Sequence, residues 1–202
     1  LTMGYLPIML AADSENIGAC VNRLIDHRVD GLVLGFYAET ISKADFKRVA
    51  ELDVPLVVCR CGAPLSDVDV IDGELREGGR LAARHLLDLG HRRFAVLVHG
   101  KARTPRDDGF IGEVEKAGCV IDPKHIIAHD PLEASCKSKM EASIKALLVD
   151  SDRPTAIFAD TDPLAYRVMR IAEDMGLSIP ENFSLVGCAD LTESADSKPP
   201  LT

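Results

Sequence analysis

The sequence predicts an α/β protein in which helices cover both faces of parallel β-sheets. Apolar runs of strand length alternate with stretches whose apolar residues recur every three or four positions, as on the buried face of a helix. The strand-like runs are continuously apolar, which is typical of strands buried on both faces. One stretch, 154–190, follows the order strand, helix, strand over about 35 residues, the size of a βαβ unit.

The stretch 154–190 also predicts where a ligand binds. Its strands are expected at 155–159 and 183–186, and Gly176 is expected to end the helix between them. Polar residues follow both strands, at 160–162 and at 188–190. Because parallel strands end at the same edge of a sheet, these residues should share one rim, where open parallel sheets bind ligands.

The rest of the chain predicts the same alternation of strands and helices. Capping residues with early acids, such as Asp13 to Glu15, indicate helix starts. Strands are expected at 4–12, 29–35, 54–58, 68–71 and 94–98. Helices are expected after Ser14, after Ser42, from 77 to 89, at about 105–116 and at about 134–149.

Composition excludes several classes of protein. The 202 residues carry a net charge of −9, so the chain is a poor candidate for direct binding to nucleic acid phosphates, and we expect no DNA binding at moderate salt. No apolar run approaches the ~20 residues of a membrane-spanning helix. The six cysteines have no framework spacing, which is typical of reduced thiols in a cytoplasmic protein.

The residues of 154–190 resemble the effector-binding domain of the lactose-repressor (LacI/GalR) family, which has a periplasmic-binding-protein-like type I fold. That family typically reads P-T-A-[IV]-[FV]-x-x-[NS]-D-x-x-A and then G-L-x-[IV]-P-E-D-[VF]-S-[LV]-V-G-[FY]-D-D. The segments that begin at Val29, Leu89 and Arg106 also resemble sequence patterns of this family. The shared residues in the main stretch are Pro154, Thr155, Ala156, Asp162, Ala165, Gly176, Leu177, Ile179, Pro180, Glu181, Ser184, Val186, Gly187 and Asp190.

The resemblance implies two Rossmann-like lobes, both with parallel sheets, and a domain that is truncated at both ends. The family's chain crosses between lobes near Gly90 and His91, so an incomplete first lobe is expected at 1–90 and a second at 91–202. The helix-turn-helix headpiece, the first strand and helix, and the returning C-terminal segment are expected to be absent from this chain.

The resemblance implies a sensor of a small molecule within a transcriptional repressor. An effector, either sugar-like or acidic, would bind between the lobes of a cytoplasmic homodimer and change their relative angle, and so alter operator binding by the absent headpiece. The alternative is a periplasmic solute-binding protein of a sugar transporter, which shares the fold. An enzyme is disfavoured, since no nucleophile with a base and no phosphate loop is present, and no cofactor is expected.

Arg106 and Thr161 are the leading candidates for contact with the effector. In the family, the matching arginine faces the cleft and holds sugar hydroxyls or a carboxylate, which suits its planar fork of donors. The alternative for Arg106 is a surface pair with Asp107 or Asp108. The residue at the position of Thr161 often contacts the ligand in the family. Asp162, before a proline, is expected to cap the following helix or to brace the cleft.

Departures from the family pattern predict the chemistry of the effector. Ala189 replaces an aspartate that binds sugars and purines, and Pro131 replaces a stacking aromatic ring. Asp190, Glu74 or Asp160 could supply the lost acceptor, and Phe36 and Tyr37 could supply apolar cover. These departures favour an acidic or phosphorylated effector, because an anion needs donors only, or a derivative with fewer ring hydroxyls.

Two further features have structural interpretations. Glu74 is expected to cap the next helix or to border the cleft, because an acid stabilises a helix N-terminus. Cys59 and Cys61 lack the second pair that a zinc site requires, so no metal site is expected.

Overall fold

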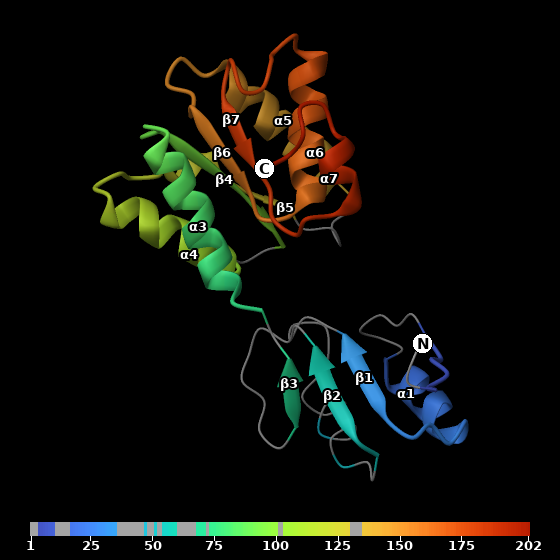
Figure 1. The fold of residues 1–202 in the computed structure, drawn as a ribbon. Coiled ribbons are helices and arrows are strands. Elements are labelled where there is room, and N and C mark those ends of the chain that lie inside the picture. Colours follow the sequence, from blue (N-terminus) through green and yellow to red (C-terminus); the bar gives the residue numbers. More distant parts are fainter. Residues whose placement is uncertain are drawn as a thin grey trace. The chain divides into compact units, whose positions relative to one another are not determined.

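The computed structural model describes residues 4–10, 17–35, 47, 51, 54–59, 68–71, 73–100, 103–129 and 135–202. Contacts divide the chain into two units, Leu1–Gly73 and Glu74–Thr202. Each unit contains a parallel β-sheet, drawn as arrows in Figure 1, so the predicted α/β class with parallel sheets is confirmed.

The contact division lies earlier than the boundary expected near residue 90. The helix α3 (Leu75–Asp88) accounts for this difference, because it packs against α4 (Pro105–Lys116) of the second unit. A Cβ atom built on Gly79 of α3 would meet the carbonyl oxygen of Arg106, and one on Gly109 of α4 would meet that of Arg76. The two helix backbones therefore touch where each carries a glycine, which fixes α3 on the second unit.

The first unit contains a three-stranded sheet. Its strands β1 (Leu32–Gly35), β2 (Leu56–Cys59) and β3 (Asp69–Ile71) are parallel neighbours in that order. The helix α1 (Ile17–Asp26) contributes Val21 to a core that it shares with β1 and β2. These strands fall where the sequence predicted them.

The strand predicted at 4–12 is wrong for the residues that the structure describes. Residues 4–10 form no strand, and Tyr5, Leu6 and Met9 are exposed. An apolar run becomes a strand only when another strand pairs with it, and no described strand pairs with this one. The predicted helix starts at 13–15 and Ser42 lie outside the described residues.

The second unit is a doubly wound α/β sandwich. Its four parallel strands run in the order β5, β4, β6, β7. Helices α3 and α4 cover one face of this sheet, and α5 and α6 cover the other. The remaining elements are β4 (Phe94–His99), the 3-10 helix η1 (Pro123–His125), β5 (Ile126–His129), α5 (Cys136–Val149), β6 (Ala156–Ala159), α6 (Asp162–Asp174), β7 (Ser184–Val186) and α7 (Thr192–Asp196).

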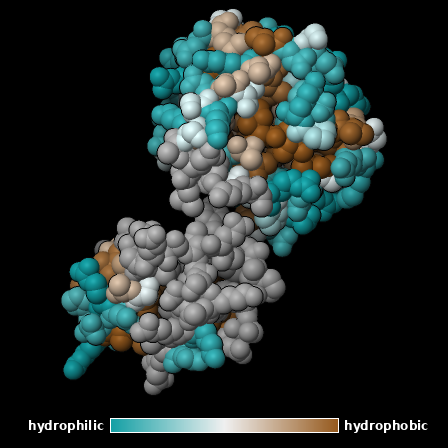
Figure 2. Space-filling model, turned by 180° about the vertical axis from the view of Figure 1, so that it is seen from behind, coloured by the Kyte–Doolittle hydropathy of each residue, from teal (hydrophilic) through white to brown (hydrophobic). Residues whose placement is uncertain are grey.

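Alternate side chains along the strands pack into two separate hydrophobic cores, one on each face of the sheet. Ala95 and Leu97 of β4 face α5 and α6, whereas Val96 and Val98 face α3 and α4. Phe158 of β6 stacks on Phe110 of α4 with ring centroids 4.5 Å apart. Continuous burial on both faces explains why these strands are apolar throughout. Figure 2 shows hydrophobic residues gathered over the middle of the visible face of this unit, with hydrophilic residues around them.

The two helix ends predicted from glycines are confirmed. Gly90 and Gly176 have φ angles of +90° and +70°, and they follow α3 and α6. Directly after Gly90, the His91 ring joins two strands at their amino ends. Its Nδ1 lies 2.9 Å from Thr155 Oγ1 and its Nε2 lies 3.0 Å from Ser184 Oγ. Burial lowers the pKa of His91, so this bridge is made by the neutral ring.

No helix among the described residues combines the length and the apolar character needed to cross a bilayer.

Candidate functional site

The candidate site lies at the carboxyl ends of β4 and β6. These strands are neighbours, but α4 follows β4 on one face of the sheet and α6 follows β6 on the other. The chain therefore leaves adjacent strands in opposite directions, and open α/β sheets bind their ligands outside the carboxyl ends of the strands at such a point. His99, Asp160 and Thr161 follow or end these strands, and the N-terminus of α4 brings Arg106 to the same place.

Arg106 forms a buried ion pair with Asp160. Its Nη1 donates to the backbone carbonyl of Asp160 at 2.9 Å and approaches the Oδ1 carboxylate oxygen at 3.4 Å. The side chains are 9% and 2% exposed, so both charges are largely removed from water. The predicted alternative, a surface pair with Asp107 or Asp108, does not form. Asp108 instead pairs with Arg76 and Arg103.

Asp160 links the two strands to α4. Its Oδ2 accepts from the backbone N–H of His99 and from the hydroxyl of Thr104, both at 3.3 Å. Thr104 is the N-cap of α4, and Asp107 completes a capping box with it. The Asp107 Oδ2 accepts from the Thr104 backbone N–H at 2.7 Å and from its hydroxyl at 2.9 Å. One threonine thus connects two buried carboxylates.

Burial raises the pKa of Asp107 to about 6, and the charge of Asp160 contributes to the rise. The Asp107 Oδ1 is buried and has no hydrogen-bond partner in the described structure. Protonation removes the cost of burying this second negative charge. The local charge of the site therefore changes between acidic and neutral pH.

Asp107→Asn should flatten the dependence of stability on pH. Because the pKa of the folded state is raised, this group favours folding below about pH 4, and that contribution is lost as pH rises through about 6. The loss amounts to about 3 kcal/mol. Urea unfolding from about pH 4 to about pH 7 measures the slope. Asp108→Asn, at the neighbouring half-exposed position, should keep the wild-type slope; a wild-type slope in Asp107→Asn would contradict the assignment.

Thr161 is the N-cap of α6, but its side chain does not cap the helix. Its Oγ1 is buried and lacks a hydrogen-bond partner in the described structure. Leaving a hydroxyl buried and unpaired costs about 1–3 kcal/mol, so a bound ligand that pairs with it would be favoured.

Asp162 does not cap α6 as predicted, because the helix already begins at this residue. Its Oδ2 instead accepts from the Leu191 backbone N–H and from the Ser194 hydroxyl, both at 2.8 Å. Tyr166 Oη lies 2.7 Å from the same Ser194 hydroxyl. Asp162 therefore braces the segment after β7 against α6, and its predicted role in bracing the cleft stays a prediction.

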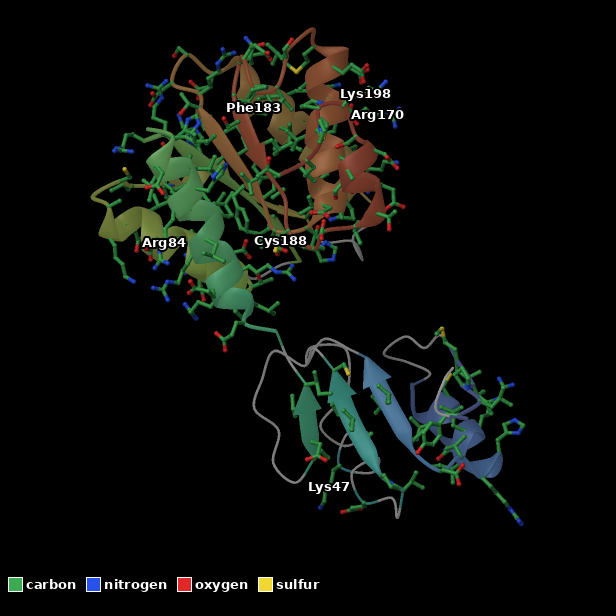
Figure 3. The ribbon with its side chains drawn as sticks, in the orientation of Figure 1. Lys47, Arg84, Arg170, Phe183, Cys188 and Lys198 are labelled. Atoms are coloured by element: carbon green, nitrogen blue, oxygen red, sulfur yellow. The ribbon has the colours of Figure 1, made fainter. Side chains whose placement is uncertain are left out.

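The other predicted residues are placed as follows. Ala189 and Asp190 are exposed and have φ angles of +145° and +55°. They follow Cys188, which lies at the carboxyl end of β7 (Figure 3). Glu74 occupies the N-cap position of α3, but it is exposed and its side chain makes no capping hydrogen bond, so that part of the prediction is wrong. Phe36 and Tyr37 lie outside the described residues.

Sequence reasoning missed two histidines beside the site. His99 and His129 end the neighbouring strands β4 and β5 in register, with ring centroids 6.0 Å apart. The signal was available, since both are polar residues directly after apolar runs. Within the described part of the chain, no three metal-binding side chains gather into a group that could hold an ion.

Comparisons with known proteins identify the family. A family model described as periplasmic binding protein-like domain matches residues 83–202. The HTH-type transcriptional repressor PurR of Haemophilus influenzae (strain PittEE) is 30% identical over 196 residues, which cover 94% of this chain and 56% of the repressor. The chain thus spans little more than half the length of that relative.

Solved structures of LacI-family proteins have the same fold. A regulatory protein of the LacI family from Chloroflexus aggregans is 25% identical, with a TM-score of 0.81 over 99% of this chain and 72% of its own. A LacI family transcriptional regulator from Lactobacillus casei, with bound glucose, is 20% identical, with a TM-score of 0.80 over 100% of this chain and 76% of its own. The chain therefore belongs to the periplasmic binding protein-like domain family, and it is similar to the PurR repressor and to a LacI-family regulatory protein of known structure.

Proposed function

We propose that this chain is the effector-sensing part of a cytoplasmic transcriptional repressor. The family model, the PurR relative and the LacI-family structures support this role. Operator DNA would be bound by a helix-turn-helix headpiece outside these 202 residues, since the chain itself carries a net charge of −9. The working form would be a homodimer, because a two-fold symmetric operator requires two related headpieces.

The observation that carries the proposal is the polar cluster at the switch point between β4 and β6. Arg106 is held by Asp160, and beside them Thr161 carries a buried hydroxyl with no hydrogen-bond partner in the described structure. A few convergent polar groups at the carboxyl ends of parallel strands are typical of a small-molecule site. The effector would bind there, with Thr161 as a contact.

The ion pair changes the expected chemistry of the effector. The prediction of an acidic effector rested on the guanidinium of Arg106 and on the loss of an acidic acceptor at Ala189. Asp160 compensates Arg106, so an anion gains less than it would from an isolated buried cation. A sugar-like effector, whose hydroxyls both donate and accept, fits a site that contains donors and acceptors. The glucose bound to the Lactobacillus casei regulator agrees with this class.

The alternative role, a solute-binding protein of a sugar transporter, has less support. PurR and the Chloroflexus aggregans protein are regulators. An enzyme is likewise disfavoured, because these relatives are regulators and the polar cluster contains no nucleophile paired with a base.

Thr161→Val should separate effector binding from stability. Valine matches threonine in shape and removes only the unpaired hydroxyl, so the free energy of unfolding should stay equal or rise slightly. Affinity for the true effector should fall by about tenfold, because its hydrogen bond to Oγ1 is lost.

A screen by calorimetry identifies the effector first, with neutral sugars, sugar acids, sugar phosphates and purines as the panel. Thr104→Ser serves as a control, because it keeps the hydroxyl that contacts Asp160. An effector that binds Thr161→Val as tightly as the wild type would show that the site lies elsewhere.

A further inference from the structure

A polar cavity of about 250 Å³ lies between α5 and α6. Its floor is apolar and consists of Met140 and Ile171, which are 2% and 6% exposed. Its walls carry three basic side chains, Lys137, Arg167 and Arg170, and two acidic ones, Glu141 and Asp174. Figure 3 places Arg170 on α6, away from the sheet. The two helices that form this cavity cover the same face of the sheet.

Arg167 has a buried donor that the described structure leaves without a hydrogen-bond acceptor. Its Nη1 is removed from solvent and makes no hydrogen bond. A charged donor in this situation costs more than a neutral one, because both its hydration and its partner are missing. An acceptor supplied from outside the chain would remove this cost.

The acidic residues of the cavity do not balance its basic ones. Glu141 is paired with Lys145, whose Nζ lies 2.8 Å from its Oε1. That hydrogen bond lowers the pKa of Glu141 first, and the charges of Arg170 and Lys137 lower it further. Among the described residues, the side chains of Lys137 and Arg170 make no hydrogen bond and no ion pair. The cavity is therefore lined by three cations and two carboxylates, one of which is already paired, in a chain whose net charge is −9.

We propose that the cavity between α5 and α6 binds a phosphate group. Arg167 and Arg170 are three positions apart on α6, so their guanidinium groups lie on one side of that helix. A tetrahedral anion accepts several charge-assisted hydrogen bonds at once, and arginine provides the planar fork that matches it. Lys137 lies in the first turn of α5, where the helix dipole also favours an anion. This proposal is independent of the effector site.

Binding of inorganic phosphate to this chain tests the proposal. The midpoint of thermal unfolding should rise with phosphate but not with chloride at equal ionic strength, and calorimetry should show one site. Arg167→Gln should weaken phosphate binding by at least about tenfold, because one charge-assisted contact is lost. Arg23→Gln removes the same charge from an exposed position on α1 and should bind phosphate like the wild type.

A second variant, expected to bind phosphate more tightly, keeps the test valid if Arg167→Gln fails to fold. Asp174→Asn removes a carboxylate that repels the anion, so phosphate should bind about threefold more tightly. Glycerol 3-phosphate separates the two sources of a phosphate group. Tighter binding of this monoester would indicate a phosphorylated metabolite, and equal binding would indicate free phosphate. Equal shifts in phosphate and chloride, or unchanged phosphate affinity in both Arg167→Gln and Asp174→Asn, would overturn the proposal.

Discussion

Gly79→Ala should lower the free energy of unfolding of this chain by about 3 kcal/mol. The added Cβ would meet the carbonyl oxygen of Arg106, which is backbone and cannot rotate away. The α3 and α4 backbones would have to separate, and the packing of both helices on the sheet would loosen. Helix propensity alone predicts the opposite sign, since alanine stabilises a helix by about 1 kcal/mol relative to glycine. Urea unfolding of the variant measures the change.

Gly112→Ala is the matched control, because it lies in α4 and its added Cβ would meet nothing within 4 Å. This variant should be more stable than the wild type by up to about 1 kcal/mol. Gly109→Ala should behave like Gly79→Ala, because its Cβ would meet the carbonyl oxygen of Arg76. A stabilised Gly79→Ala would show that the two helices do not make this close approach in solution.

The sequence predicted the second unit well because each signal there is local. Continuous apolar runs identified β4 and β6, and three- and four-residue spacing identified α6. Proline at the first turn and a capping residue placed α4 at Pro105–Lys116, as expected. These signals agree with the tertiary structure, since the same residues form the two cores.

The strand β5 and the helix α7 of the second unit escaped prediction because their stability is not local. The strand β5 contains only two large apolar residues, Ile126 and Ile127, and it is a strand because β4 pairs with it. The helix α7 has five residues and no apolar stripe. It depends on the hydrogen bond between Ser194 and Asp162, which joins residues 32 positions apart. No pattern within a short window contains that information.

Arg106 and Thr161 of the candidate site were singled out from the sequence, but the pairing of Arg106 was not. Arg106 was identified by its place in a motif, but its partner Asp160 lies 54 positions away. The two meet because β4 and β6 are neighbours in the sheet, which depends on the order of strands. The pairing matters for function, since it compensates the charge that suggested an acidic effector.

Arg106→Ala should lower the free energy of unfolding by about 3–5 kcal/mol, because it leaves the Asp160 carboxylate buried without its cation. Asp160 is 1% exposed, so water cannot replace the guanidinium without local opening. Asp160→Asn should cost less, since an amide oxygen can still accept from the His99 backbone N–H and the Thr104 hydroxyl. Denaturant unfolding of both variants gives the two values.

The double variant Arg106→Ala with Asp160→Asn distinguishes stability from effector recognition. Without the carboxylate, the loss of Arg106 no longer leaves a buried charge without a counter-charge. The double variant should therefore be more stable than Arg106→Ala by about 1–3 kcal/mol. Both Arg106→Ala and the double variant should lose the response to the proposed effector, because both lack the guanidinium donors. A double variant that regains both stability and effector binding would assign Arg106 a purely structural role. One no more stable than Arg106→Ala would show that the buried pair does not form.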